Sequence, residues 1–304
     1  MIRFEYHQPT LLNETIALLV QRGEEAALLA GGTALLIDMK RGARRPRHVI
    51  SLWQVPGLAG VQVKGSLRTP ALATSAGASV GALTTISDLA EAIASRPSLK
   101  GLLEAAWMIG GRQVQNMATV GGNICKASPG ADMVPPLLCL DARLRLVGPE
   151  GERMTPLDGF LIGPDQMALQ PAEVLTEIYV PPTAPRTGTA FLKVMRRHAM
   201  DCSIVAVATR ISLAEDGQTC VEARIGVGAA APNPFRAKRA ESLLIGKRIE
   251  PDLVRAAAHQ SREESQPISD VRASADYRRM LVETLIERAV LKAAERAAQD
   301  GDYR

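Results

Sequence analysis

Aromatic residues are scarce in this chain of 304 residues, at 3% of the sequence. Its core must therefore be built mainly from Ala, Val, Leu and Ile, and the hydrophobic fraction of 46% is sufficient for that. No apolar run approaches the roughly 18–20 residues of a membrane-spanning helix, so we expect no membrane span. The first ten residues hold an acid and a proline where a signal peptide needs an apolar stretch, which predicts a chain without a targeting segment.

Cysteine is also scarce, and it is scattered. The four cysteines are Cys125, Cys139, Cys202 and Cys220, and no two of them form a CxxC pair. A clustered metal or iron–sulfur site needs several ligands at close spacing, so we expect none in this chain. Reduced, unpaired thiols fit a cytoplasmic location.

The chain has little excess charge, with a net value of +4. The densest basic run lies at residues 40–47 and has no interleaved aromatics that would stack on bases. We interpret this run as a solvated loop, or as a loop that faces a partner or a phosphate. No nucleic-acid binding is therefore expected.

The length of the chain predicts two domains. Pro181-Pro182, with Pro185 and Gly188 soon after, is the strongest linker signal. We place the boundary there, with one domain at 1–182, divided into subdomains at about 1–55 and 56–182, and a second domain at 187–304.

Hydrophobic periodicity predicts the secondary structure of both domains. In the first domain we expect strands at 4–7, 27–29, 48–52 and within 72–81, and helices at 13–22, 35–39 and 99–109, the last closed by Gly110-Gly111. In the second domain, strands at 204–213 and 221–227 pair across an Asp216-Gly217 turn, and the chain from Arg236 onward is mostly helical, ending in an amphipathic helix at 276–298.

The first candidate site is the turn Gly31-Gly32-Thr33, which follows an apolar strand and precedes a helical stretch. Glycines allow the backbone to approach a ligand closely, and amides at the start of a helix point toward an anion. A hydroxyl such as that of Thr33 can donate to an anionic oxygen. This pattern favours a phosphate group, although turns of this kind also occur for purely structural reasons.

The second candidate site, Thr119-Val-Gly-Gly-Asn123, repeats this chemistry with a hydroxyl, two glycines and an amide. It leads to Asp132, whose carboxylate together with the Asn123 amide can hold a polyhydroxyl chain. Two such loops indicate a dinucleotide that lies extended between them. The alternative is two unrelated turns and a surface aspartate.

A third glycine pattern, Gly226-Val-Gly-Ala-Ala-Ala231, matches the GxGxxA nucleotide fingerprint only superficially. That fingerprint requires a helix to begin at once. Pro232 and Pro234 follow immediately and would remove donors and clash within the first turns. We interpret this segment as the end of a strand and a turn.

Four motifs in a fixed order resemble the FAD-binding subunit of the xanthine dehydrogenase family of molybdenum hydroxylases. The motifs are Leu29-Ala-Gly-Gly-Thr33, Ala118-Thr-Val-Gly-Gly-Asn-Ile124 with Ala127-Ser-Pro-Gly-Ala-Asp132, Phe191-Leu-Lys-Val-Met-Arg-Arg-His-Ala-Met-Asp201, and Ala229-Ala-Ala-Pro-Asn-Pro-Phe-Arg236. The similarity covers nearly the whole chain. It implies an α+β fold, with a vanillyl-alcohol-oxidase-type (PCMH) FAD-binding domain in two subdomains and a C-terminal antiparallel sheet with helices.

The resemblance also implies a set of residues that bind FAD. The loops would bind the pyrophosphate, mostly through backbone amides, with Leu29, Ala30, Gly31, Gly32, Thr33, Ala34 and Leu35 in the first loop and Thr119, Val120, Gly121, Gly122 and Asn123 in the second. Asn123 and Asp132 would hold ribityl or flavin polar atoms, and Ile109 and Leu175 would lie beside the flavin rings. Lys193 would lie close to the flavin, the alternative being a solvated strand residue. Arg197 and Asp201 fall on a loop that controls access to the ring in some relatives.

In such complexes the FAD is held non-covalently, and the molybdenum cofactor and 2Fe–2S clusters are in partner subunits. The resemblance therefore implies an electron-transfer subunit that works with a large molybdenum subunit and a small 2Fe–2S subunit, as a dimer of heterotrimers. Position 34 departs from the family, because Ala stands where many relatives carry Asp or Ser. The alternatives are a self-sufficient flavoenzyme of the same fold, similar to enolpyruvoyl-sugar reductase, and a nucleotide-binding scaffold that has lost FAD.

Overall fold

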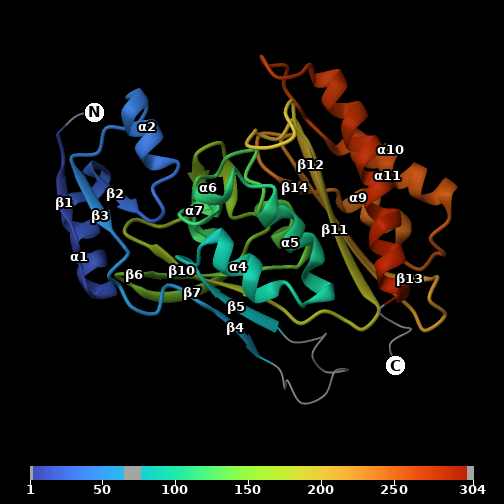
Figure 1. Ribbon diagram of the computed structural model, residues 1–304, viewed down its shortest axis with the longest axis horizontal. Helices are drawn as coiled ribbons and strands as arrows, with labels where there is room; N and C mark the ends of the chain where they lie inside the picture. The colour runs from blue at the N-terminus through green and yellow to red at the C-terminus, as the bar shows by residue number, and fades with distance from the viewer. Residues whose placement is uncertain (1–2, 65–76, 300–304) are drawn as a thin grey trace.

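The computed structural model describes residues 3–64 and 77–299. Its sheets and helices form three parts that follow one another along the long axis of the molecule (Figure 1). Strands and helices alternate in the N-terminal part but are largely segregated in the other two, so the fold is α+β, as the family resemblance implies.

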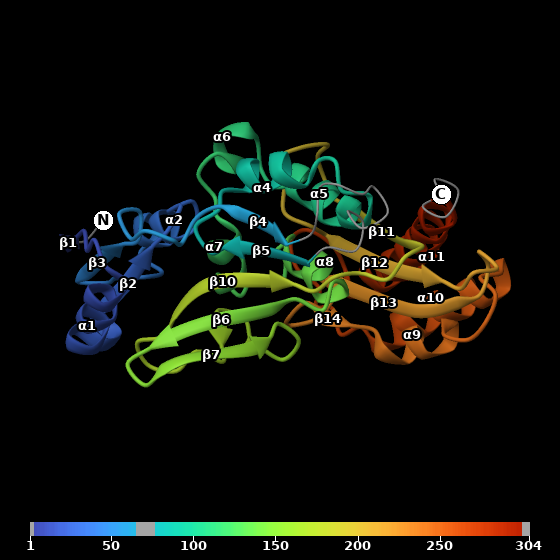
Figure 2. The same cartoon turned by 90° about the horizontal axis from the view of Figure 1, so that it is seen from below.

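The N-terminal part is a small parallel sheet with the strand order β1-β3-β2. A helix lies on each side of it, α1 on one face and α2 on the other (Figure 2). Its elements are β1 (Glu5–His7), α1 (Leu12–Arg22), a 3-10 turn (Gly23–Glu25), β2 (Ala26–Leu29), α2 (Leu35–Arg41) and β3 (His48–Ser51). Ile16 of α1 is buried together with Leu83 and Val174 of the next part, so a shared apolar core joins the two.

The central part is built on an antiparallel sheet of five strands in the order β4-β5-β10-β6-β7. One face of this sheet packs on short helices through a large core that includes Val80, Leu144 and Ile178, and the other face carries polar side chains. The elements are β4 (Val61–Lys64), β5 (Gly77–Gly81), α4 (Ile86–Ile93), a 3-10 turn (Pro97–Leu99), α5 (Lys100–Trp107), α6 (Arg112–Gln115), α7 (Val120–Cys125), α8 (Val134–Cys139), β6 (Arg143–Gly148), β7 (Gly151–Pro156), β8 (Leu161–Gly163), β9 (Gln166–Met167) and β10 (Val174–Val180).

The C-terminal part is an antiparallel sheet in the order β11-β12-β13-β14, covered by helices. The long helix α11 packs so closely on β11 that a Cβ at Gly188 would lie 2.0 Å from the Ala293 carbonyl oxygen. The elements are β11 (Thr187–Val194), β12 (Val205–Leu213), β13 (Cys220–Gly228), β14 (Phe235–Arg236), α9 (Lys238–Leu244), α10 (Pro251–Glu264) and α11 (Ala275–Gln299).

The predicted hairpin and the predicted C-terminal helices are confirmed. β12 and β13 pair across a turn in which Gly217 has a φ of +66°. The helix predicted at 99–109 ends earlier, at Trp107, and Gly110 takes the expected left-handed conformation with a φ of +51°. β13 ends at Gly228 with a turn and no helix follows at once, so the GxGxxA pattern is a strand end, as expected. Of the strands expected within 72–81, residues 72–76 lie outside the described residues.

A cluster of charges connects the C-terminal part to the central part. Glu104 on α5 accepts hydrogen bonds from the backbone amide of Phe191 at 2.9 Å, from Lys292 at 2.8 Å and from Arg296 at 2.7 Å. Its carboxylate thus contacts both β11 and α11. Charge-assisted hydrogen bonds of this kind are stronger than neutral ones, so this cluster contributes to fixing the two parts against each other.

Glu104→Gln should reduce stability more at neutral pH than in acid. Burial tends to raise the pKa of Glu104, but the hydrogen bonds from Arg296, Lys292 and the Phe191 amide hold it below the ordinary value of 4.5. Stability from a carboxyl group of this kind is present above its unfolded pKa and is lost as the pH falls through its folded pKa.

We expect urea unfolding to show a loss of about 1–3 kcal/mol at pH 7 and a smaller loss below about pH 4. Glu91 is an exposed carboxylate on α4, and Glu91→Gln is the control that should leave stability nearly unchanged. An equal loss from Glu104→Gln at both pH values would show that the ionised form of Glu104 is not what stabilises the contact.

Candidate functional site

The first glycine loop carries a run of backbone donors without protein partners. Within the described residues, none of the amides from Gly31 to Ala34 donates a hydrogen bond to the protein, and neither does the Thr33 hydroxyl. Gly32 has a φ of +72°, a conformation that favours glycine, and α2 begins directly afterwards at Leu35. Successive unbonded amides of this kind form a concave site for an anion.

The first loop packs directly against the backbone that leads into the second loop. A Cβ at Gly31 would lie 1.8 Å from the Met117 carbonyl oxygen, and a Cβ at Gly122 would lie 3.9 Å from the Ala30 Cβ. Glycine at position 31 is therefore required for the contact. The structure thus brings together the two loops, as the sequence predicts for a ligand that lies between them.

The second loop differs from the first because its amides are already bonded. The Thr119 hydroxyl accepts from the Gly122 amide at 3.1 Å and caps α7, and its carbonyl accepts from the Asn123 amide at 2.9 Å. The amides of Val120 and Gly121 donate to Thr84 and Ala82. Binding through free backbone amides, predicted for both loops, thus has geometric support only in the first.

Asn123 of the second loop offers a free side-chain amide donor. Its Oδ1 accepts from the Met133 amide at 3.2 Å, which ties α7 to the segment before α8. Its side-chain NH₂ group has no protein acceptor in the described part of the chain and remains available to a ligand.

Asp132 and Lys193 form a buried ion pair between the central and C-terminal parts. The Lys193 ammonium donates to Asp132 at 2.7 Å and to the Met108 carbonyl at 3.3 Å, and the Ser203 hydroxyl donates to Asp132 at 2.6 Å. Only 1% of the Lys193 side chain is exposed, so the alternative of a solvated strand residue is wrong. Asp132 is likewise buried and is not the surface aspartate of the other alternative.

Burial is the main influence on the Asp132 carboxyl. It raises the pKa of Asp132, against the opposing effects of the Lys193 ammonium and the Ser203 hydroxyl. Lys193 has three N–H donors, of which Asp132 and Met108 take two. One donor is thus left for another group at this buried position.

Ile109 and Leu175 are both buried in the apolar core of the central part. Gln115 donates to the Ile109 carbonyl at 3.0 Å and so fixes the turn that follows α5. Lys126, directly after α7, donates to Asp38 of α2 at 3.0 Å, which links the helix after the first glycine loop to the helix that contains the second. The sequence analysis missed Gln115 and Lys126, because no local pattern indicates their distant partners.

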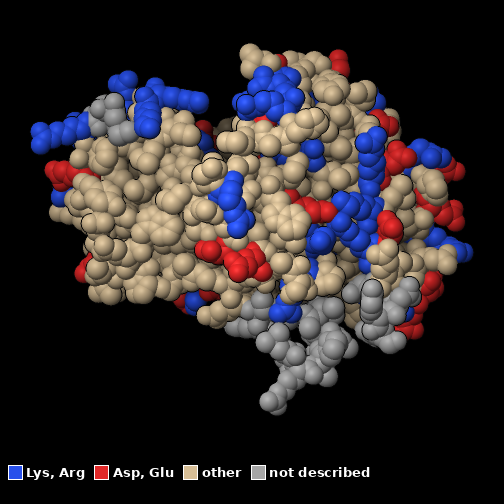
Figure 3. Space-filling model, in the orientation of Figure 1, with Lys and Arg blue, Asp and Glu red and all other residues tan. Residues whose placement is uncertain are grey.

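The segment between β11 and β12 lies over the turn at Gly110-Gly111, where a Cβ at Gly111 would lie 3.3 Å from the Met200 sulfur. Asp201 lies 3.7 Å from Arg196 and from Arg197, whose side chains are about half exposed or more. Figure 3 shows a hollow between the part that carries α2 and this segment, with Lys and Arg side chains on both rims. Such rims attract an anionic ligand.

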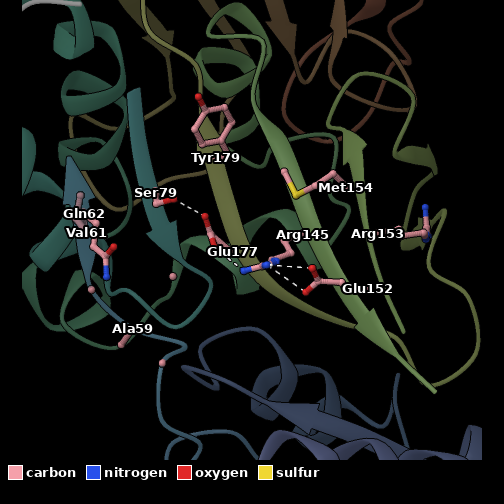
Figure 4. A pocket seen from close by; sticks show the side chains of 13 residues that line it. Ala59, Val61, Gln62, Ser79, Arg145, Glu152, Arg153, Met154, Glu177 and Tyr179 are labelled. Carbon is pink, nitrogen blue, oxygen red and sulfur yellow. Dashed lines mark hydrogen bonds and ion pairs between the residues drawn. The ribbon is translucent and has the colours of Figure 1, made fainter. Parts of the chain in front are cut away.

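An open cavity with a volume of about 750 Å³ lies elsewhere, on the polar face of the five-stranded sheet (Figure 4). Its charged side chains bond to one another: Arg145 donates to Glu152 at 3.1 Å and to Glu177 at 3.5 Å, and Ser79 donates to Glu177. Neither glycine loop lines this cavity. Arg145 is thus already paired with carboxylates, whereas the first glycine loop presents unbonded amides, so the cofactor site is better placed at the loops.

Free amides at one glycine loop, a second glycine loop against it and basic rims together define a site for an extended anionic dinucleotide, as in flavoproteins. Two family models match the chain: the FAD binding domain in molybdopterin dehydrogenase over residues 2–183, and the CO dehydrogenase flavoprotein C-terminal domain over residues 190–293. The chain belongs to the FAD-binding subunits of the molybdenum hydroxylases, and FAD is its cofactor, as the motifs predict.

Relatives match over nearly their whole length. The chain is 35% identical to the carbon monoxide dehydrogenase medium chain of Hydrogenophaga pseudoflava, covering 97% of this chain and 99% of the relative. It is 32% identical to the xanthine dehydrogenase FAD-binding subunit of Escherichia coli O157:H7, covering 96% of each. A solved structure of carbon monoxide dehydrogenase from H. pseudoflava superposes with a TM-score of 0.90 at 36% identity, covering 97% of this chain and 99% of that one.

The helices of the described chain include none that combines enough length with enough apolar character to cross a membrane.

Proposed function

We propose that this chain is the electron relay of a molybdenum hydroxylase complex. In this proposal, bound FAD takes up electrons from a small 2Fe–2S subunit and delivers them to an external acceptor, while a large subunit oxidises the organic substrate at its molybdenum cofactor. The chain itself binds and orients the flavin and tunes its electronic properties.

The observation that carries this proposal is the pairing of the titratable groups near the loops. Asp132 is bonded to Lys193 and Ser203, and Asp201 lies between two arginines. An enzyme that oxidises an organic substrate unaided usually presents an unpaired acid or base beside the flavin. These pairings support a role in holding the cofactor rather than in proton transfer with a substrate.

The proposed FAD contacts follow the geometry of each residue. The free amides from Gly31 to Ala34 and the Thr33 hydroxyl bind the pyrophosphate, and the Asn123 NH₂ group donates to a polar atom of the cofactor. Lys193 would offer its third donor to the flavin, where its cation would favour negative charge on the ring. Asp132 then acts as a positioning residue for Lys193. The remaining predicted contacts are Leu29, Ala30, Leu35, Ile109, Thr119, Val120, Gly121, Gly122 and Leu175.

We extend the proposal to domains and assembly. The FAD domain comprises residues 1–182 and the second domain 187–304, which the separate apolar cores of the central and C-terminal parts support.

The relative from H. pseudoflava is named a medium chain, which supports assembly with a large and a small subunit, and we propose a dimer of heterotrimers. The four free thiols support a cytoplasmic location.

One alternative loses support from the comparisons and the other from the geometry of the first loop. A self-sufficient flavoenzyme similar to enolpyruvoyl-sugar reductase does not account for the match of residues 190–293 to the CO dehydrogenase flavoprotein C-terminal domain. A scaffold without FAD does not account for the unbonded amides at Gly31 to Ala34. The relay within a complex accounts for both.

Cofactor analysis of the separated subunit tests the division of labour. We expect one FAD per chain, without stoichiometric iron or molybdenum, because the scattered cysteines offer no cluster site. The measurements are flavin absorbance after acid release and elemental analysis of the lone subunit. Mixing this subunit with the large and small subunits should yield a complex that contains all three cofactors. Stoichiometric iron in the lone subunit would overturn the proposed division.

A further inference from the structure

Three potential metal ligands meet at the N-terminal sheet, away from both glycine loops. Glu5 and His7 lie two residues apart on β1, so their side chains point to the same face of the strand. Glu5 pairs in register with His48 at the start of β3, which places the His48 side chain on that face too. The sequence analysis, which considered only cysteines for a metal site, missed this group because 41 residues separate the two histidines.

The ligand atoms of this group converge on one point. His7 Nε2 lies 3.1 Å from His48 Nδ1, and the Glu5 carboxylate lies 3.3 Å from His48 Nδ1 and 3.9 Å from His7 Nε2. A tetrahedral ion with bonds of about 2.0–2.1 Å holds its ligand atoms about 3.3 Å apart. The three side chains therefore need only small shifts to bind a single ion.

We propose that Glu5, His7 and His48 bind one divalent transition-metal ion, with Zn²⁺ as the best match to two imidazoles and a carboxylate. Without an ion, the two ring nitrogens that face each other form one hydrogen bond, in which one donates and the other accepts. An ion accepts all three lone pairs at once. The carboxylate also offsets part of its charge.

The exposure of the three ligands suits entry of the ion from solvent. The exposed fraction of the side chain rises from 8% for His48 to 21% for His7 and 70% for Glu5. His48 thus anchors the site in the protein interior, while Glu5 closes it from the surface. The site remains accessible on its outer side.

The position of the site indicates a structural role. β1 is a three-residue edge strand, and the ion would fasten it to β3 at the centre of the sheet (Figure 1). His48 pairs with Ala26 at the start of β2, whereas the first glycine loop leaves the other end of β2, after Leu29. The metal would therefore stabilise the sheet that carries this loop without contacting the flavin.

The test uses the full chain with FAD bound and no histidine tag, stripped with EDTA and titrated with Zn²⁺ against a chromogenic chelator. We expect one Zn²⁺ per chain and a higher midpoint of thermal unfolding in its presence. His7→Gln and Glu5→Gln should each weaken binding at least about 10-fold, because loss of an outer-shell partner alone has an effect of that size. Both positions are on an edge strand, and retained flavin absorbance reports that each variant is folded.

The matched control is His259→Gln, which removes an exposed histidine of α10 that lies beside Glu283 of α11. This variant should leave the affinity for Zn²⁺ unchanged. X-ray absorption at the zinc edge should show nitrogen and oxygen neighbours at about 2.0–2.2 Å and no sulfur at about 2.3 Å. A sulfur neighbour would assign the ion to a cysteine such as the exposed Cys202 and overturn the proposal. Failure to retain Zn²⁺, or equal affinity in wild type and both variants, would overturn it as well.

Discussion

Gly31→Ala is expected to strip FAD from the purified protein. The new Cβ would lie 1.8 Å from the Met117 carbonyl oxygen and 2.7 Å from its carbonyl carbon, and both are backbone atoms that cannot turn aside. The two glycine loops must then separate, at a cost of about 3 kcal/mol for overpacking of this kind. Since 1.4 kcal/mol corresponds to a factor of ten, FAD affinity should fall by about 100-fold.

The control for this substitution is Gly130→Ala, in the segment between α7 and α8. A Cβ there would meet nothing within 4 Å, so we expect this variant to retain its flavin. The measurement is the ratio of flavin to protein absorbance after gel filtration, followed by titration of the stripped protein with FAD. Full occupancy in Gly31→Ala would contradict the assignment of the cofactor to these loops.

Lys193→Met is expected to be the most destabilising single change near the site. It leaves the buried Asp132 carboxylate without its cation, and breaking a buried pair in this way costs about 3–5 kcal/mol. The free energy of unfolding, measured by urea denaturation of the flavin-bound protein, should fall by this amount. Destabilisation below about 1 kcal/mol would mean that the pair is not maintained in solution.

The double variant Lys193→Met, Asp132→Asn separates stability from flavin tuning. Removing both charges should restore most of the lost stability, because no unpaired charge is left in the interior. The flavin reduction potential of the double variant should nevertheless differ from that of the wild type, because both proteins bind FAD but only the wild type has the cation proposed to face the ring. A wild-type potential in the double variant would reduce Lys193 to a purely structural residue.

The elements of secondary structure that depend on local pattern were largely predictable from the sequence. The β12–β13 hairpin follows from two strand-like segments on either side of Asp216-Gly217, and the C-terminal helices follow from apolar periodicity. The end of α5 at Trp107, two residues before the predicted end, was not predictable, because the short turn after it is fixed by Gln115, whose side chain bonds back to Trp107 and Ile109. Such contacts depend on tertiary packing, which a local pattern does not record.

The candidate site was predictable as a set of loops but not as a set of bonds. The glycines identified both loops, yet only the structure shows that the second loop uses its amides on Thr119, Thr84 and Ala82. The partner of Asp132 lies 61 residues away, on a strand of the C-terminal part. A pairing across parts of the chain leaves no spacing signal, and for the same reason the group formed by Glu5, His7 and His48 went unnoticed.

The central claim is that this chain relays electrons and does not oxidise the organic substrate itself. Anaerobic stopped-flow absorbance of the flavin tests it most directly, first with the isolated subunit and then after addition of the molybdenum and 2Fe–2S subunits. We predict that the substrate of the complex leaves the flavin of the isolated subunit oxidised, although dithionite reduces it and an acceptor reoxidises it, and that the partner subunits restore reduction by substrate. Rapid reduction of the flavin by the substrate in the isolated subunit would contradict the account.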